Sequence, residues 1–145
     1  MSKSWDTSEL DGLIVDFAAA GPKAEGLTRL VIKKVAFDTV AGAQARVPVD
    51  TSNLKNSIGP DLDDDGMGFE AGPTANYGAA IEFGSEPHVI KAKNAKALFW
   101  PGAEHPVKQV NHPGNAPQPY MRPAFEQAVE PIDKVMGQVG EKAIT

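Results

Sequence analysis

The sequence predicts an α+β fold in which a small antiparallel sheet of about four strands is flanked by a long N-terminal helical region and a C-terminal helix. Apolar residues recur at helical spacing near both ends, whereas the middle alternates short apolar runs with turns rich in Gly, Pro and Asp. The 145 residues suit a single domain, 1–145. Its expected order is an N-terminal helix or arm at 1–21, a long helix at 22–46, a sheet with short helices and loops at 47–118, and a C-terminal helix at 119–145.

Two helices are expected in the N-terminal region. The apolar stripe that starts at Ser8 ends at Gly21-Pro22, and a second stripe runs from Pro22 to about Arg46. A proline at the first position of a helix loses no hydrogen bond, so Pro22 suits a helix start. At the other end a sustained stripe begins near Pro123, and Pro131 within it predicts a kink.

Short elements are expected between these helices. The side-chain oxygens of residues 50–53 can cap a helical turn that ends near Ile58. Tyr77 and Ile81 lie four residues apart, which predicts a short helix closed by Gly84. The expected strands are 67–71, 88–91, 97–100 and 107–110, with 88–91 and 97–100 forming a hairpin.

Composition excludes several functional classes. The chain has 14 Lys and Arg against 19 Asp and Glu, and the basic residues are scattered, so a DNA-gripping surface is not expected. Cysteine is absent, which excludes disulfide scaffolds, thiolate metal sites and cysteine nucleophiles. No apolar run is long enough for a membrane span, and the N-terminus does not resemble a signal peptide.

Two groups of residues resemble metal-binding sequences in part, but neither matches a complete metal site. Asp61 to Gly66 places carboxylates at positions one, three and five and glycine at six, as calcium-binding EF-hand loops do, but position twelve is Gly72 instead of glutamate. The three histidines, His88, His105 and His112, lack the pairing of a zinc site. The sequence also contains no phosphate-binding or hydrolase motif. We therefore expect no cofactor, no metal and no catalytic residue.

Three motifs rich in turn-forming residues remain. They are PVDTSNLKNSI from Pro48 to Ile58, YGAAIEFGS from Tyr77 to Ser85, and PQPYMRPAF from Pro117 to Phe125. Together they resemble a family of siphophage proteins, the tail-completion and head–tail joining proteins of the lambdoid "gene product ten" type. The family typically shows P-V-D-T-G-x-L-x-x-S-I, then Y-A-x-x-V-E-F-G-T, then P-x-P-F-L-R-P-A-F. The order and spacing match from about Leu27 to the C-terminus.

Departures from the family pattern are mild. Ser52 stands where glycine is usual, so the turn there must avoid a positive φ or tolerate its strain. Ser85 replaces threonine and Tyr120 replaces phenylalanine. The stretch from Ala103 to Ala116 is longer than is typical of short members.

The resemblance implies a non-enzymatic structural protein of the virion neck, assembled in the host cytoplasm. It implies a homo-oligomer, a hexameric ring, which contacts the portal, connector or head-closure proteins on one side and the tail terminator or tail tube protein on the other. Double-stranded DNA would pass through the ring without specific binding, and no membrane is involved. The alternatives are a tail terminator, a head-closure protein or, from a different class, a metal-binding soluble domain.

Residues of the motifs are the candidates for structural or interface roles. We hypothesise that the charges of Glu82 and Arg122 pair, that Asp61 to Asp65 faces the DNA channel or a basic partner, and that the Pro-rich loop 112–119 reaches a neighbour. Three aromatic residues, Tyr77, Phe83 and Phe125, are predicted to pack in the core. The candidate residues are Asp50, Thr51, Leu54, Ser57, Tyr77, Glu82, Gly84, Pro119, Arg122 and Pro123.

Overall fold

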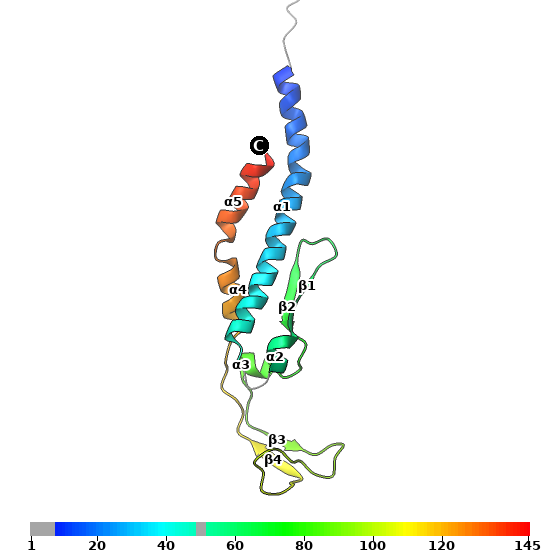
Figure 1. Cartoon of the computed structure of the whole chain (residues 1–145), viewed down its shortest axis with the longest axis vertical. Helices are drawn as coiled ribbons and strands as arrows, with labels where there is room; N and C mark the ends of the chain where they lie inside the picture. Colours follow the sequence, from blue (N-terminus) through cyan, green and yellow to red (C-terminus); the bar gives the residue numbers. More distant parts are fainter. Residues whose placement is uncertain (1–7, 49–51) are drawn as a thin grey trace, which may run out of the picture.

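A computed structural model of the chain describes residues 8–48 and 52–145. A long helix, α1 (Ser8–Arg46), forms the axis of an elongated molecule. The helices α4 (Met121–Val129) and α5 (Ile132–Ala143) return antiparallel along α1, which extends beyond the C-terminus (Figure 1). The α+β class and the long helices at both ends are therefore as predicted.

The helix break predicted at Gly21-Pro22 is wrong, because α1 continues through both residues. Proline within a helix removes one hydrogen bond and crowds the residue before it, chiefly through that residue's Cβ atom. Gly21 has no Cβ, so this contact with Pro22 is absent. One source of crowding is thus absent, and the helix-favouring residues on either side, such as Ala20 and Lys23, favour continuation of the helix.

The kink predicted at Pro131 is confirmed. Helix α4 ends at Val129 and α5 starts at Ile132, so Glu130 and Pro131 separate two helices. Pro131 can donate no backbone hydrogen bond, but its carbonyl accepts one from the Val135 N–H at 3.0 Å, which begins the new helix. The bend lets both helices follow α1 (Figure 1).

The expected four-stranded sheet is replaced by two separate two-stranded sheets. Strand β1 (Ile58–Leu62) pairs antiparallel with β2 (Phe69–Pro73), and β3 (His88–Lys91) pairs antiparallel with β4 (Gln109–His112). The predicted hairpin between 88–91 and 97–100 is wrong. Residues 97–100 instead take part in a tight reversal, in which Leu98 forms a bridge with Val107. Apolar runs located the extended segments but could not identify their partners.

Strand β1 was not predicted because glycine, proline and aspartate dominate it. Pro60 is tolerated because a strand of a two-stranded ribbon has one edge that needs no partner. The inner face of the ribbon, which includes the buried Ile58 and the partly buried Leu62 and Phe69, lies against α1. Two short helices complete the fold, α2 (Ser52–Ser57) and α3 (Gly78–Phe83).

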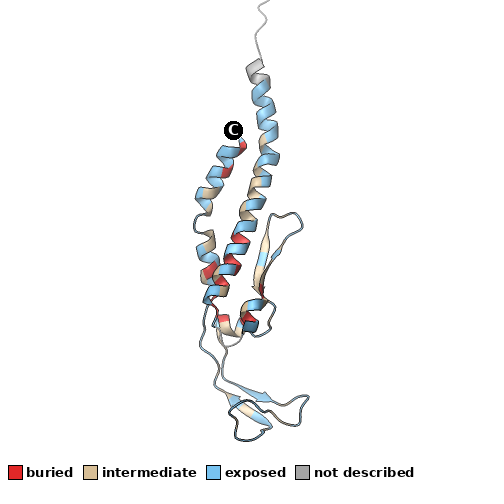
Figure 2. Ribbon diagram, in the orientation of Figure 1, coloured by how far each residue is buried: buried red, intermediate tan, exposed pale blue. Residues whose placement is uncertain are grey.

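The main buried cluster is small and lies at the lower end of α1, where Figure 2 shows the red residues of several elements converging. The buried members are Val40, Ala43, Val47, Leu54, Ile58, Tyr120 and Ala124. The prediction that Tyr77, Phe83 and Phe125 pack in the core is wrong, since their exposed fractions are 39%, 76% and 46%. No helix in 8–48 or 52–145 is both long and apolar enough to cross a bilayer.

Candidate functional site

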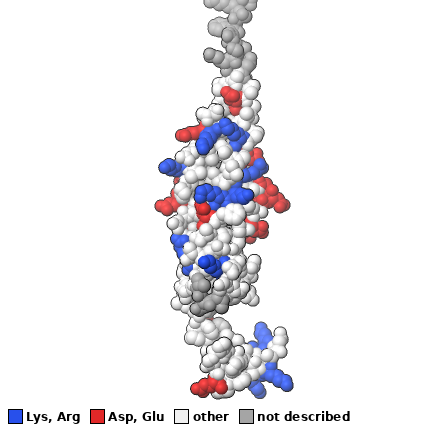
Figure 3. Space-filling model, viewed as in Figure 1, with Lys and Arg blue, Asp and Glu red and all other residues white. Residues whose placement is uncertain are grey.

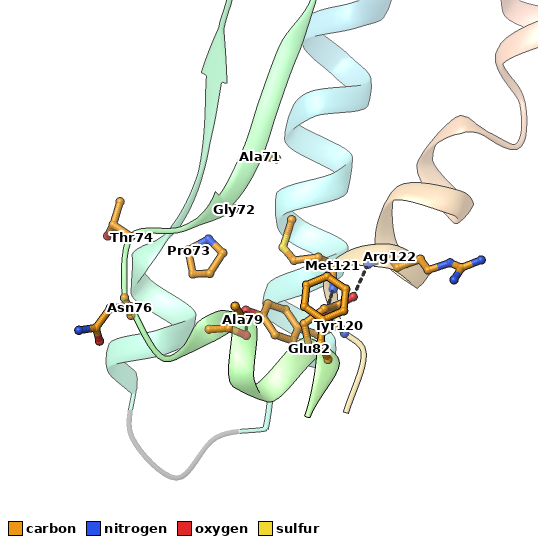
Figure 4. Close-up of a pocket in the computed structure, with 13 residues that line it drawn as sticks. Ala71, Gly72, Pro73, Thr74, Asn76, Ala79, Glu82, Tyr120, Met121 and Arg122 are labelled. Atoms are coloured by element: carbon orange, nitrogen blue, oxygen red, sulfur yellow. Dashed lines mark hydrogen bonds between the residues drawn. The ribbon is translucent and has the colours of Figure 1, made fainter. Parts of the chain in front are cut away.

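The three sequence motifs meet at the lower end of α1. The first motif supplies α2, the second supplies α3, and the third leads into α4. We call this meeting point the motif junction and define it by Ser57, Gly78, Glu82 and Tyr120. Figure 4 shows the side chains of the last two lying between α3 and the start of α4.

Glu82 binds the beginning of α4 through its carboxylate. Oε2 accepts hydrogen bonds from the N–H groups of Tyr120 at 2.7 Å and Met121 at 2.9 Å, and Oε1 accepts one from the Arg122 N–H at 3.0 Å. The first N–H groups of a helix have no partner within the helix and carry partial positive charge. Glu82 therefore caps a helix that begins 39 residues later in the chain.

Burial and hydrogen bonding act in opposite directions on this carboxyl group, which is only 7% exposed. Burial raises the pKa of Glu82, but the N–H groups of Met121, Tyr120 and Arg122 and the Arg122 charge together outweigh burial and lower the pKa below its ordinary value. The group is thus held ionised, with both oxygens occupied by N–H donors. This arrangement is that of a structural cap.

The predicted pairing of Glu82 with Arg122 is only half right. The two residues are joined, but through the backbone N–H of Arg122 and not through its guanidinium group. The Arg122 guanidinium instead pairs with Glu126 one turn further along α4, at 2.8 Å, and Figure 4 shows it pointing away from Glu82. That pair is largely exposed, so it contributes little to stability.

Tyr120 is the largest fully buried side chain among the described residues and was absent from the candidate list. Its ring belongs to the core cluster, and its hydroxyl donates to the Gly78 carbonyl at 3.2 Å. A Cβ atom at Gly78 would lie 2.3 Å from the Pro73 ring and 2.9 Å from the Tyr120 hydroxyl oxygen. Only glycine permits this approach. The available sequence signal was an aromatic residue directly before a predicted helix, where apolar side chains often pack back onto the fold.

Ser57 joins the first motif to the second. Its hydroxyl donates to the Leu54 carbonyl at 2.8 Å and accepts from the Ala75 N–H at 3.3 Å, while its carbonyl accepts from the Thr74 N–H at 3.0 Å. Leu54 itself is buried in the core cluster. Both residues therefore contribute to the structure of the junction.

The remaining candidates lie at the edge of the junction or outside it. Tyr77 precedes α3, and its hydroxyl accepts a 3.3 Å hydrogen bond from the Asn53 side chain. Pro119 is exposed, and Pro123 is partly buried in the first turn of α4. Asp50 and Thr51 lie outside the described residues.

Gly84 ends α3 and begins a projecting arm, which we define as residues 85–115. Its φ of 75° and ψ of 178° belong to a backbone region that only glycine adopts readily. A Cβ atom here would lie 2.6 Å from the Asn115 carbonyl oxygen. The arm is closed at its base by two hydrogen bonds of 3.0 Å between Ser85 and Asn115, and it contains β3 and β4.

An apolar hollow of about 600 Å³ opens beside the motif junction. Its walls come from the β2–α3 connection, α3 and the start of α4, with Tyr120 and Met121 at its centre (Figure 4). Phe83 also lines the hollow, and its side chain is 76% exposed. A hollow of this kind suits contact with an apolar side chain of another protein.

The acidic stretch forms the turn of the β1–β2 hairpin, which differs from the helix–loop–helix arrangement of an EF-hand. Asp61 pairs across the hairpin with Glu70, and Gly72, which would be position twelve, pairs with Gly59. Arg29 of α1 donates to the Asp65 carbonyl at 2.7 Å and packs under Gly66. His88 and His112 face each other on paired strands with ring centroids 5.0 Å apart. In the described part of the chain, no three His, Asp or Glu side chains gather as metal ligands would.

Comparison with protein families gives one match. Residues 19–84 match the family described as "Bacteriophage HK97-gp10, putative tail-component". This segment is HK97-gp10-like. The match spans just under half of the chain and contains the first motif and nearly all of the second, whereas the third motif and the arm lie beyond it. No curated protein and no solved structure matched the chain.

The match confirms the resemblance that the motifs indicated, at the level of a bacteriophage tail component. The HK97-gp10-like segment runs from the middle of α1 to the end of α3, so it includes the core residues of α1 and the capping residue Glu82. The coarse class that follows is a structural component of the virion, which contacts other virion proteins.

Proposed function

We propose that the chain is a subunit of an oligomeric ring in the neck of a siphophage, where it completes the tail and joins it to the DNA-filled head. The observation that carries the proposal is the convergence of the three motifs on one buried junction. Two of those motifs lie in the HK97-gp10-like segment, and the third is held to them by Glu82 and Tyr120. The motifs thus act as one folding unit, which supports reading the third motif together with the HK97-gp10-like segment.

The large surface of the molecule supports assembly with other chains. Its accessible area is 10970 Å², whereas a compact monomer of 15.3 kDa exposes about 7,200 Å². Among the described residues, α1 and the arm project from a small core and contribute to this excess (Figure 1). Such shapes are typical of subunits that complete their packing against neighbours.

Exposed apolar side chains occur at both projecting parts. On the free end of α1 they are Leu13, Ile14, Val15 and Phe17, and on the arm they are Val89, Ile90, Phe99 and Trp100. Exposed apolar groups gathered in this way mark protein-binding surfaces. A closed ring needs two different patches on each subunit, each meeting the other on the neighbour, and a projecting part can supply one of them.

The charge of the chain suits a channel through which DNA passes. A net charge of −5 repels phosphates, so DNA would slide past without being gripped. In the proposed assembly the ring is hexameric, and its other neighbours are the portal, connector or head-closure proteins and the tail terminator or tail tube protein. A tail terminator or a head-closure protein is the second candidate function, because both are small ring proteins.

The proposed function is tested by assembling phage particles in the absence of this chain. We expect electron microscopy to show DNA-filled heads beside separate tails of normal length, and infectivity to fall by several orders of magnitude. Tails of abnormal length would favour the terminator, and heads that lose their DNA would favour head closure. Infectious virions formed without the chain would contradict every one of these roles.

A further inference from the structure

The β1–β2 hairpin presents an outer face with unbalanced negative charge. Asp61 and Glu70 lie directly opposite each other in the antiparallel pair, an arrangement of like charges that destabilises a sheet. Neither carboxylate lies within 4.0 Å of a Lys or Arg nitrogen in the described part of the chain. Residues 58–73 contain four aspartates and one glutamate and no basic residue.

This face is also hollowed. Gly59 and Gly72 form the next cross-strand pair on the same face, and no atom lies within 4 Å of where their Cβ atoms would be. A shallow cavity of about 350 Å³ extends over the two glycines, with Asp61 and Glu70 at its rim. The face therefore offers a trough that a long side chain can enter, next to two carboxylates that need a cation.

The arm has the opposite character. It contains four lysines and two glutamates, a net charge of +2, within a chain whose total is −5. Figure 3 shows these lysines gathered on the arm, at the bottom of the view, and acidic residues gathered over the β1–β2 hairpin above it. The lysines are Lys91, Lys93, Lys96 and Lys108.

The arm also exposes apolar groups that no described residue of the chain covers. Phe99 is 68% exposed and Trp100 is 44% exposed at the reversal near its tip. A two-stranded ribbon is marginal by itself, so an arm of this length needs something to pack against. Within its own chain the arm is tied to the body at its base, by the Ser85–Asn115 hydrogen bonds.

We propose that the arm of one copy docks on the outer face of the β1–β2 hairpin of a second copy, with its lysines beside Asp61 and Glu70 and its aromatic residues packed on the ribbon. The contact rests on the ring proposed above and gives that ring its heterologous interface, in which the arm and the hairpin are different patches of each subunit. Arg29 lies against the other side of the hairpin turn, where it is engaged with Glu25 and the Asp65 carbonyl, so the outer face stays available.

Variants of the full-length chain with reversed charges on the arm or on the hairpin test the contact. Their self-association is measured by sedimentation equilibrium at low salt. The arm variant Lys91→Glu/Lys93→Glu and the hairpin variant Asp61→Lys/Glu70→Lys are each expected to weaken self-association at least about tenfold. An equimolar mixture of the two variants is expected to recover it, because each patch then finds a complementary partner in an alternating ring. The chain carrying all four changes is expected to recover it as well.

The control variant, Lys33→Glu/Lys134→Glu, makes the same change of charge at exposed sites on α1 and α5 and is expected to associate as the wild type does. Failure of the mixture to associate would overturn the contact, and so would a wild-type chain that stays monomeric at millimolar concentration. The arm variant could also lose binding to duplex DNA while its self-association stays unchanged. That result would overturn the arm–hairpin contact and would indicate that the arm lysines bind nucleic acid. A chain that stays monomeric yet still joins heads to tails would overturn the contact alone, leaving the neck function intact.

Discussion

Replacing Glu82 by alanine is expected to lower the free energy of unfolding by about 3 kcal/mol, as measured by denaturant unfolding at pH 7. Three backbone N–H groups at the start of α4 would lose a charged acceptor in a place that water barely reaches. Bonds to a charged partner are worth more than neutral ones, and the loss also releases α4 from α3. Glu82→Gln keeps one carbonyl acceptor and is expected to lose about 2 kcal/mol.

The same carboxylate predicts how stability depends on pH. The folded-state pKa of Glu82 is lowered, so its contribution is fully present above the unfolded pKa of roughly 4.3 and is lost as pH falls through the folded value. The wild type is therefore expected to lose more stability than Glu82→Gln in that acidic window. Equal losses in the two proteins would contradict a cap made by ionised Glu82.

Glu126→Gln is the matched control, because it removes a carboxylate that pairs with Arg122 on the exposed side of α4. It is expected to leave the free energy of unfolding nearly unchanged. A double-mutant cycle of Glu82→Gln with Arg122→Gln is expected to show only weak coupling, because the Arg122 charge is the smallest influence on Glu82 and the contact itself uses the backbone N–H of residue 122, which neither substitution removes. Strong coupling would instead show that the two side-chain charges pair.

Replacing Tyr120 by alanine is expected to destabilise the chain by about 4 kcal/mol, because its ring is fully buried between α1 and the motifs. Tyr120→Phe keeps the ring and loses only the hydrogen bond to Gly78, so about 1 kcal/mol is expected. Thermal or denaturant unfolding measures both. Tyr77→Ala removes an exposed tyrosine of the same size and is expected to have a much smaller effect.

Burial also raises the pKa of Tyr120, with smaller contributions from the charge of Glu82 and from Tyr77. A raised pKa means that this group stabilises the fold below the unfolded value of about 10 and that the benefit is lost as pH rises through the folded value. The alkaline loss is expected to be smaller in Tyr120→Phe. An equally steep loss in that variant would show that Tyr120 titrates as an exposed residue does.

Local patterns predicted the parts of the fold that depend on neighbours in sequence. Helical periodicity gave α1, α4 and α5, and Pro131 gave the break between the last two. Gly84 gave the end of α3, because its positive φ is a local requirement. The break expected at Gly21-Pro22 failed on an equally local detail, the missing Cβ of Gly21.

Strand pairing and burial could not be predicted in the same way, because they depend on contacts between distant residues. The run 88–91 pairs with 109–112, some twenty residues away, and nothing in either run identifies the other. Phe83 and Phe125 have the composition of core residues but lie on surfaces that this chain does not cover. Exposed and buried apolar residues are alike in type, so only the structure separates them.

The motif junction was predicted in its residues but not in its chemistry. Sequence reasoning paired the charges of Glu82 and Arg122, whereas the unpaired N–H groups at the start of α4 were the stronger partners. The sequence assigns Tyr120 no role beyond its place in the third motif, because its burial depends on distant elements meeting there. The first N–H groups of a predicted helix need hydrogen-bond acceptors. An acidic residue inside another motif of the same chain is therefore a candidate to cap that helix.

Electron cryomicroscopy of complete particles tests the central claim most directly, namely that this chain is a structural subunit at the head–tail junction. We expect several copies arranged symmetrically around the DNA channel between head and tail, each recognisable by the 39-residue rod of α1. Particles whose neck contains no density for the chain would contradict the account.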